Sequence, residues 1–248
     1  MSIKQKVQYQ QNNVNNINKM KHIHFSKVNK YFNRHDLIRR LGGRKHRKLS
    51  HSVKMKIDKL EIKLKDIIKP RFSYRIGKVK STDNGVVYVE GGLSFTSSNL
   101  EKTMKDCNEI IFFIATIGDG IEEKIAQFTE ENYLSKAYIL DSMGSVTIEN
   151  MVEEFYQAMR ERYKSKGREV TFRFSPGYCD WSIKDQKKLF SFFEPHPTGV
   201  ELTDSCLMQP RKSISGIFGI LPPDTDSSFL PYNPCSECSK KNCIGRRQ

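Results

Sequence analysis

Long apolar runs are missing from this sequence, and tryptophan occurs only once among its 248 residues. No stretch approaches the roughly 20 apolar residues that a membrane-spanning helix requires, and the N-terminus, M-S-I-K-Q-K, lacks the apolar core of a secretory signal. We therefore expect no membrane association and a cytoplasmic location. The sequence also has no G-x-S-x-G, H-E-x-x-H or phosphate-binding loop, and its six histidines show no pair at catalytic spacing. These absences argue against the common hydrolase, metalloprotease and nucleotide-hydrolysing classes.

Acidic residues are scarce at the beginning of the chain. Residues 1–60 contain sixteen Lys or Arg and two acids, which accounts for the whole formal charge of +14, while the rest of the chain is neutral. A basic arm can bind the phosphates of RNA or DNA, but it is as often only a solvated segment. A nucleic-acid-binding module is therefore an alternative that we keep open without favouring it.

The first residues are rich in Asn and Gln and poor in large apolar side chains, a composition that cannot build a core. We expect residues 1–33 to form a disordered basic extension and residues 34–248 to form one folded unit. Its tail, from residue 221, is rich in Pro, Ser and Asp before it reaches three cysteines. This composition predicts a surface-wrapping end.

Apolar spacing in the remaining chain alternates between helical and extended patterns. Strands and helices follow one another without regular βαβ alternation, so the α+β class is the best interpretation. A long helical pattern occupies the centre of the chain. The spacing predicts helices from His35 and over 53–68, 131–166 and 184–193, and strands over 71–76, 86–95, 109–116, 170–174 and 213–220.

The motif R-F-S-P-G-Y, which begins at Arg173, combines a cation with a turn. Its proline fixes φ, and its glycine lets a ligand touch the backbone. Arg173 could hold a carboxylate through two parallel hydrogen bonds, and Tyr178 could lie over a flat or cationic group. An ordinary β-turn capped by an arginine has the same pattern, so the motif alone does not specify a ligand.

Several motifs in a fixed order are more specific. The chain reads R-F-S-P-G-Y-C-D-W, D-Q-K-K-L-F and G-V-E-L-T-D-S-C-L-M-Q-P-R-K-S-I-S-G, preceded by A-T-I-G-D-G-I-E-E-K-I and K-A-Y-I-L-D-S-M-G-S-V-T-I-E. Together they resemble the activation domain of cobalamin-dependent methionine synthase, in particular its stand-alone forms. The likeness extends from about Asp36 to the final cysteines.

The resemblance implies a twisted, mainly antiparallel sheet edged by helices that binds S-adenosylmethionine in a shallow groove. It also implies a role in the reductive methylation of inactive cob(II)alamin, with the electron supplied by a flavodoxin- or ferredoxin-type protein. No D-x-H-x-x-G stretch is present, so cobalamin must come from a partner chain. The protein would then be the activation subunit of a methyltransferase, serving methionine synthase or, alternatively, another corrinoid protein.

The resemblance also assigns residues to the ligand site. In the family, an arginine binds the ligand carboxylate, and backbone or ring groups of the following turn line the ligand. The matching residues here are Arg173, Ser175, Gly177 and Tyr178. A helical acid near the ligand matches Glu153, or Glu154 if the helix register differs. The family also has a tyrosine after the S-x-S-G strand and an aspartate near the N-terminus, and neither has an evident equivalent.

The basic pair Arg211 and Lys212 precedes the strand expected over 213–220. In the family this stretch lies near the cofactor side, so the resemblance implies that both face the corrin or a partner. A basic pair at a strand edge is the alternative.

The three tail cysteines follow the pattern C-x₂-C-x₄-C, whose first pair can chelate a metal through one turn. Zinc or an iron–sulfur cluster could bind here, and uncoordinated thiols are the alternative. The candidate ligands are Cys235, Cys238 and Cys243, and Cys206, Cys179 or His196 could supply the missing fourth.

Overall fold

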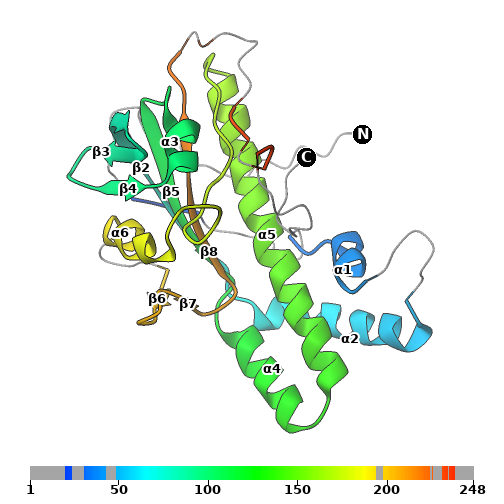
Figure 1. Ribbon diagram of the computed structural model, residues 1–248. Coiled ribbons are helices and arrows are strands. Elements are labelled where there is room, and N and C mark those ends of the chain that lie inside the picture. Colours follow the sequence, from blue (N-terminus) through cyan, green and yellow to red (C-terminus); the bar gives the residue numbers. More distant parts are fainter. Residues whose placement is uncertain are drawn as a thin grey trace.

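The computed structural model describes residues 20–23, 31–42, 49–193, 198–223, 225, 231–233 and 235–237. Its centre is a curled sheet of antiparallel strands in the order β4-β3-β2-β5-β8, with β1 pairing to β2 (Figure 1). A separate two-stranded sheet consists of β6 (Glu201–Leu202) and β7 (Met208–Gln209), and β7 contacts β8. This confirms the α+β prediction. The strands of the sheet are β1 (Lys21–Ile23), β2 (Arg71–Asp83), β3 (Val86–Val89), β4 (Ser94–Thr96), β5 (Glu109–Thr116) and β8 (Ser213–Ile220).

One long helix, α5 (Leu134–Lys164), runs beside the sheet and past it toward α4 (Figure 1). Among the described residues, no helix combines the length and the apolar character needed to cross a membrane. The other helices are α1 (Arg34–Arg40), α2 (His51–Ile67), α3 (Ser98–Met104), α4 (Gly120–Glu130), α6 (Gln186–Ser191) and the 3₁₀ helix η2 (Ile183–Asp185).

Strand β5 is the central element of the core, and its continuous apolar sequence reflects burial of both faces. Successive side chains of a strand point to opposite sides. Accordingly, Ile111 and Phe113 belong to the cluster shared with α5, whereas Ile110 and Phe112 belong to the cluster on the opposite face. Complete burial of each such side chain stabilises the fold by about 1.5–3 kcal/mol.

Helix α5 is placed by its own apolar positions. Its methionines Met143, Met151 and Met159 are buried, in agreement with core packing rather than a cofactor role. Phe155 contacts Phe72 with a distance of 4.4 Å between the ring centroids. The helix is therefore fixed against the sheet near the position of Glu153.

Two expectations need correction. The folded part begins before residue 34, because Lys21 pairs with Tyr74 of β2 and the side chains of Ile23 and Tyr31 are buried in the core. Residues 1–19 and 24–30 of the expected extension lie outside the described residues. The strand expected over 170–174 is also wrong, since this segment forms only isolated bridges, at Val170 and Phe174.

Candidate ligand-binding site

The segment that carries Arg173 runs along the outer edge of β8. Phe174 and Ile217 exchange two backbone hydrogen bonds of 2.8 Å. Gly216 makes this approach possible, because a Cβ at this position would lie 2.8 Å from the Phe174 carbonyl oxygen and 2.8 Å from Ser175 Oγ. The S-I-S-G sequence of β8 and the R-F-S-P-G-Y motif are thus in direct contact with each other.

A tight turn follows at once. The Tyr178 amide donates to the Ser175 carbonyl at 3.2 Å, and Gly177 has a φ of +89°. Proline at the second position and glycine with positive φ at the third are typical of a type II turn. The turn leaves the Tyr178 side chain 57% exposed. Ring and backbone are therefore presented at the surface directly after Arg173.

The loop after the turn is anchored on two sides. The buried Trp181 donates from Nε1 to Asp185 Oδ2 at 3.0 Å. Asp180 accepts hydrogen bonds from Ser97 Oγ at 2.6 Å and from Asn99 Nδ2 at 2.9 Å. Partial burial opposes ionisation of Asp180, but these hydrogen bonds outweigh it and hold the carboxyl pKa below its ordinary value.

Arg173 and Glu153 meet across the gap between the edge segment and α5. Arg173 Nη2 donates to Glu153 Oε2 at 2.9 Å, and its guanidinium carbon lies 5.9 Å from the centre of the Tyr156 ring. The Arg173 side chain is 14% exposed and that of Glu153 46%. Among the described residues, Glu153 is the only hydrogen-bond acceptor for this guanidinium. The site therefore presents a largely buried cation beside an accessible carboxylate.

The structure thus brings together the residues that the sequence assigned to one ligand. Arg173, Ser175, Gly177 and Tyr178 lie within one edge segment and its turn, and α5 supplies the acid. The carboxylate that pairs with Arg173 is that of Glu153.

Arg211 and Lys212 lie elsewhere, at the beginning of β8. Lys212 pairs with Asp141 of α5 at 2.7 Å and donates to Ser145 Oγ at 2.8 Å, and its side chain is only 12% exposed. Lys212 is five residues from Ile217, or roughly 17 Å along the strand. The expectation that Lys212 faces a partner is therefore at odds with its internal ion pair, whereas Arg211 is exposed.

A groove of about 350 Å³ lies beside Arg211 and Lys212, between α4, α5 and the residues before β8. Glu122 of α4 closes one side and accepts hydrogen bonds from the backbone amides of Arg211 and Lys212. Its remaining lining includes Asp141 and Thr129. Because the groove is distant from Arg173, we treat it as separate from the site described above.

Sequence reasoning missed two residues near the site. Tyr156 lies under the Arg173 guanidinium and donates to the Thr171 carbonyl at 3.0 Å. Asp36 of α1 accepts a hydrogen bond of 3.5 Å from Asn150, which is one helical turn before Glu153. The spacing of three residues between Glu153 and Tyr156 was a usable signal. Nothing local in the sequence indicates that Asp36 approaches α5.

The cysteines occupy three different surroundings. Cys179 is exposed in the loop after the turn, and Cys235 is half-buried in the tail. Cys107 and Cys206 are buried, and burial raises the pKa of the Cys107 thiol to about 12. Cys238, Cys243 and His196 lie outside the described residues. Within the part of the chain that the structure describes, no three His, Cys, Asp or Glu side chains form a metal-binding group.

Comparison with known proteins identifies the family and the fold. A family model described as "Vitamin B12 dependent methionine synthase, activation domain" matches residues 98–226. A similar solved structure is the crystal structure of the MetH reactivation domain bound to AdoHcy. It has a TM-score of 0.63 at 14% identity, and the match covers 86% of this chain and 81% of that one. No curated protein sequence matches the chain.

Proposed function

This chain belongs to the family of the vitamin B12-dependent methionine synthase activation domain, and on that premise we propose that it binds S-adenosylmethionine between Arg173, Glu153 and the turn over 175–178. The bound molecule is the methyl donor for a cobalamin that a partner chain carries. The protein then acts as the activation subunit of a methyltransferase rather than as a complete enzyme.

The observation that carries the proposal is the pairing of Arg173 with Glu153. The amino-acid end of S-adenosylmethionine is a zwitterion, so it needs a cation for its carboxylate and an anion for its ammonium group. Arg173 hydrogen-bonds to protein through Nη2, and its guanidinium has further donors suited to a carboxylate. The Glu153 carboxylate also accepts from Gln157 Nε2 at 2.7 Å through Oε1, and each of its oxygens has a further lone pair that can accept from the ammonium group. One ion pair thus offers both halves of the complementary charge pattern.

The turn supplies the remaining contacts. The exposed Tyr178 ring can cover the adenine or the sulfonium group, because aromatic faces attract both flat and cationic groups. Gly177 is exposed, so a ligand can reach its backbone, and the space that a Cβ would take there is filled by Ile183. The hydrogen bonds of Asp180 and Trp181 hold this loop in place before the ligand arrives, which lowers the entropic cost of binding.

The chemistry supplied from outside is a one-electron reduction of cob(II)alamin by a flavodoxin- or ferredoxin-type protein, followed by methyl transfer that releases S-adenosylhomocysteine. The contribution of this chain is proximity, since it holds the methyl donor where the partner's cobalt can reach it. We expect the partner to be methionine synthase and the location to be the cytoplasm. Another corrinoid methyltransferase protein is the alternative partner, which co-purification would distinguish.

Of the two basic residues before β8, Arg211 remains our candidate for the face toward the corrin or the partner. It is exposed, whereas the Lys212 ammonium group is bound to Asp141 and Ser145. Both residues border the groove between α4 and α5. This face is distinct from the Arg173 site, so partner docking and ligand binding are separable by mutation.

Methyl transfer tests the proposal. A cobalamin-binding module of methionine synthase, inactivated as cob(II)alamin, is mixed with a one-electron donor and with S-adenosylmethionine labelled in its methyl group. We expect label on the cobalamin and an equal amount of S-adenosylhomocysteine only when this chain is added, and a strong reduction with Arg173→Ala. Transfer that is independent of the chain, or unchanged by Arg173→Ala, would contradict the proposal.

A further inference from the structure

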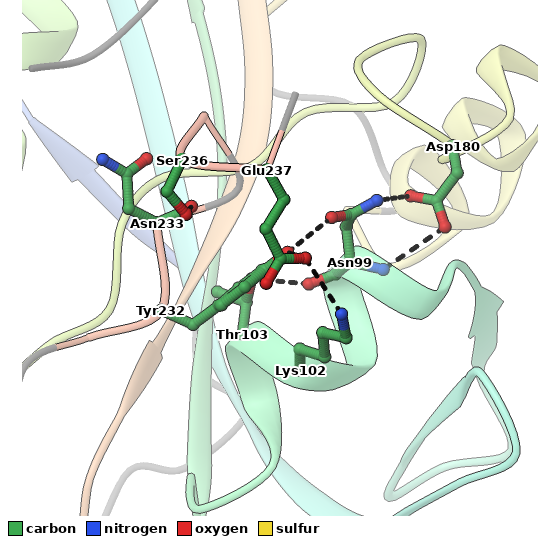
Figure 2. A network of polar contacts seen from close by, with 8 residues as sticks. All are labelled: Asn99, Lys102, Thr103, Asp180, Tyr232, Asn233, Ser236 and Glu237. Atoms are coloured by element: carbon green, nitrogen blue, oxygen red, sulfur yellow. Dashed lines mark hydrogen bonds and ion pairs between the residues drawn. The ribbon is translucent and has the colours of Figure 1, made fainter. Parts of the chain in front are cut away.

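Asn99, near the beginning of α3, lies between the loop of the ligand site and the C-terminal tail. Its side-chain nitrogen donates to Asp180 Oδ1 at 2.9 Å, and its side-chain oxygen lies 2.8 Å from the Tyr232 hydroxyl. Figure 2 shows Asp180 on one side of Asn99 and the tail residues on the other. One asparagine therefore connects two segments that are 81 and 133 positions away from it in the sequence.

The chemistry of the two neighbours fixes the orientation of this amide. The Asp180 carboxylate, whose pKa is held below its ordinary value, only accepts hydrogen bonds, so the nitrogen of Asn99 must face it. The amide oxygen then needs a donor, and the Tyr232 hydroxyl is that donor. Partial burial and the hydrogen bond to Glu237 raise the pKa of Tyr232 to about 12, so the hydroxyl keeps its proton at neutral pH. Without this proton, nothing on the tail side holds the amide in place.

Contacts with Lys102 of α3 hold the tail beside Asn99. Glu237 Oε2 lies 2.9 Å from the Tyr232 hydroxyl and 3.1 Å from Lys102 Nζ (Figure 2). The Lys102 ammonium group also lies 5.4 Å from the centre of the Tyr232 ring. The hydroxyl has one proton for two acceptors, and Lys102 donates to the competing Glu237 oxygen. The cation therefore stabilises the position of the ring and reduces the competition for the proton that Asn99 needs.

A turn in the tail brings Glu237 back to Tyr232. The Cys235 amide donates to Asn233 Oδ1 at 3.0 Å, and the Ser236 amide donates to the Asn233 carbonyl at 3.0 Å. Asparagine commonly stabilises turns through such hydrogen bonds to the backbone that follows. The described tail residues thus form a small folded unit that presents two side chains to α3.

The loop of the ligand site transmits a movement of Asp180 to Tyr178. The Gly177 amide donates to the Trp181 carbonyl at 2.9 Å, and the Trp181 amide donates to the Tyr178 carbonyl at 3.0 Å, so the loop is closed on itself. Cys179, between Tyr178 and Asp180, has a φ of +52°, which is uncommon for a residue with a side chain. Such a conformation persists only when the surrounding contacts maintain it. The anchor of Asp180 is therefore also an anchor of the turn.

We propose that Asn99 and Tyr232 are positioning residues for the ligand-binding turn, and that the tail is the strap through which Tyr232 acts. This inference rests on the proposed function, since it gives the tail a part in holding the turn in the conformation that binds S-adenosylmethionine. Tyr232 acts through Asn99, and Asn99 acts through Asp180. Because the turn is ordered before the ligand arrives, less conformational entropy is lost on binding.

Hydrogen exchange of the turn tests the proposal without any ligand. Tyr232→Phe removes one oxygen atom and keeps the ring beside Lys102, so the tail can still pack on α3. We expect the amides of residues 177–181 to exchange about two- to tenfold faster than in the wild type, the factor that one hydrogen bond contributes. Tyr133→Phe, at a tyrosine that is 48% exposed and has no part in these contacts, is the matched control and should exchange as the wild type does. Unchanged exchange of the turn in Tyr232→Phe would overturn the proposal.

Titration with S-adenosylmethionine separates positioning from a general loss of stability. We expect Tyr232→Phe and Asn99→Ala each to weaken binding about two- to tenfold. The double variant should bind no more weakly than Asn99→Ala alone, because both substitutions break the same connection. Effects that multiply in the double variant would show that Tyr232 does not act through Asn99. Failure of the wild type to bind would contradict the proposed function, whereas normal binding by Tyr232→Phe would refute the strap alone.

Discussion

Replacing Gly216 by alanine should separate the ligand-site segment from the sheet. The added Cβ would lie 2.8 Å from the Phe174 carbonyl oxygen and from Ser175 Oγ, and 2.9 Å from the Phe113 ring. Real Cβ atoms do not approach other heavy atoms so closely, and a backbone carbonyl cannot move away without its neighbours. The edge segment must therefore shift away from β8, and Arg173 with it.

The magnitude follows from three contributions. Overpacking costs about 1–3 kcal/mol. Weakening the two hydrogen bonds between Phe174 and Ile217 costs about 1 kcal/mol each. The lower backbone entropy of alanine in the unfolded chain returns about 0.5–1 kcal/mol. We therefore expect Gly216→Ala to lower the free energy of unfolding by about 2–4 kcal/mol.

Urea unfolding measures this loss, and titration with S-adenosylmethionine measures the effect on binding. Gly77→Ala is the matched control, because it lies in the same sheet and its added Cβ would meet only side-chain atoms, at 3.3–3.4 Å. We expect the control to change stability by less than about 1 kcal/mol. Equal stability and equal ligand affinity of the two variants would refute the packing argument.

Three further outcomes follow from the charges and thiols. Hydrogen bonds lower the pKa of Asp180 in the folded state. The ionised carboxylate therefore stabilises the folded protein fully above its unfolded-state pKa of about 4, and this stabilisation is lost as the pH falls through the folded-state pKa. As the pH is lowered from 5 toward the value at which the protein unfolds, the free energy of unfolding should therefore fall less in Asp180→Asn than in the wild type. At pH 8, the exposed thiol of Cys179 should react with iodoacetamide much faster than that of Cys107, whose pKa is about 12. Lys212→Met removes the ion pair with Asp141 and should lower the free energy of unfolding by about 1–3 kcal/mol.

Each of these has a contrary result. An acid transition in Asp180→Asn that is identical to that of the wild type would show that this carboxylate is not linked to stability. Equal alkylation of Cys107 and Cys179, read by peptide mass spectrometry, would contradict their assigned exposures. A Lys212→Met variant as stable as the wild type in urea would show that the ion pair with Asp141 contributes nothing net.

The regular elements were largely predictable because their patterns are local. The apolar run of β5 and the spacing of α5 depend on residues that follow one another, and β8 was predicted over the range it occupies. The short strand β1 was not predictable. Lys21–Ile23 has only three residues in a polar region, and its pairing partner in β2 is about fifty residues away. The segment over 170–174 has strand composition, but it bridges β8 only at its two ends.

The candidate site likewise has features that were predictable from the sequence and features that were not. The turn chemistry of Pro176 and Gly177 can be read directly from the sequence. The pairing of Arg173 with Glu153 joins residues twenty positions apart on an edge segment and a helix, so only the family resemblance suggested it. The internal ion pair of Lys212 with Asp141, 71 positions away, could not be foreseen from either source.

Isothermal titration of the full chain with S-adenosylmethionine, alone and with a cobalamin-binding module, tests the central claim most directly. We predict saturable one-site binding by the wild type and a loss of affinity of about tenfold or more in Arg173→Gln, since a hydrogen bond to a charged group contributes about 1.5–3 kcal/mol. Arg160→Gln, an exposed arginine on α5, should bind as the wild type does. No binding by the wild type in either setting, or equal affinity in Arg173→Gln, would contradict the account.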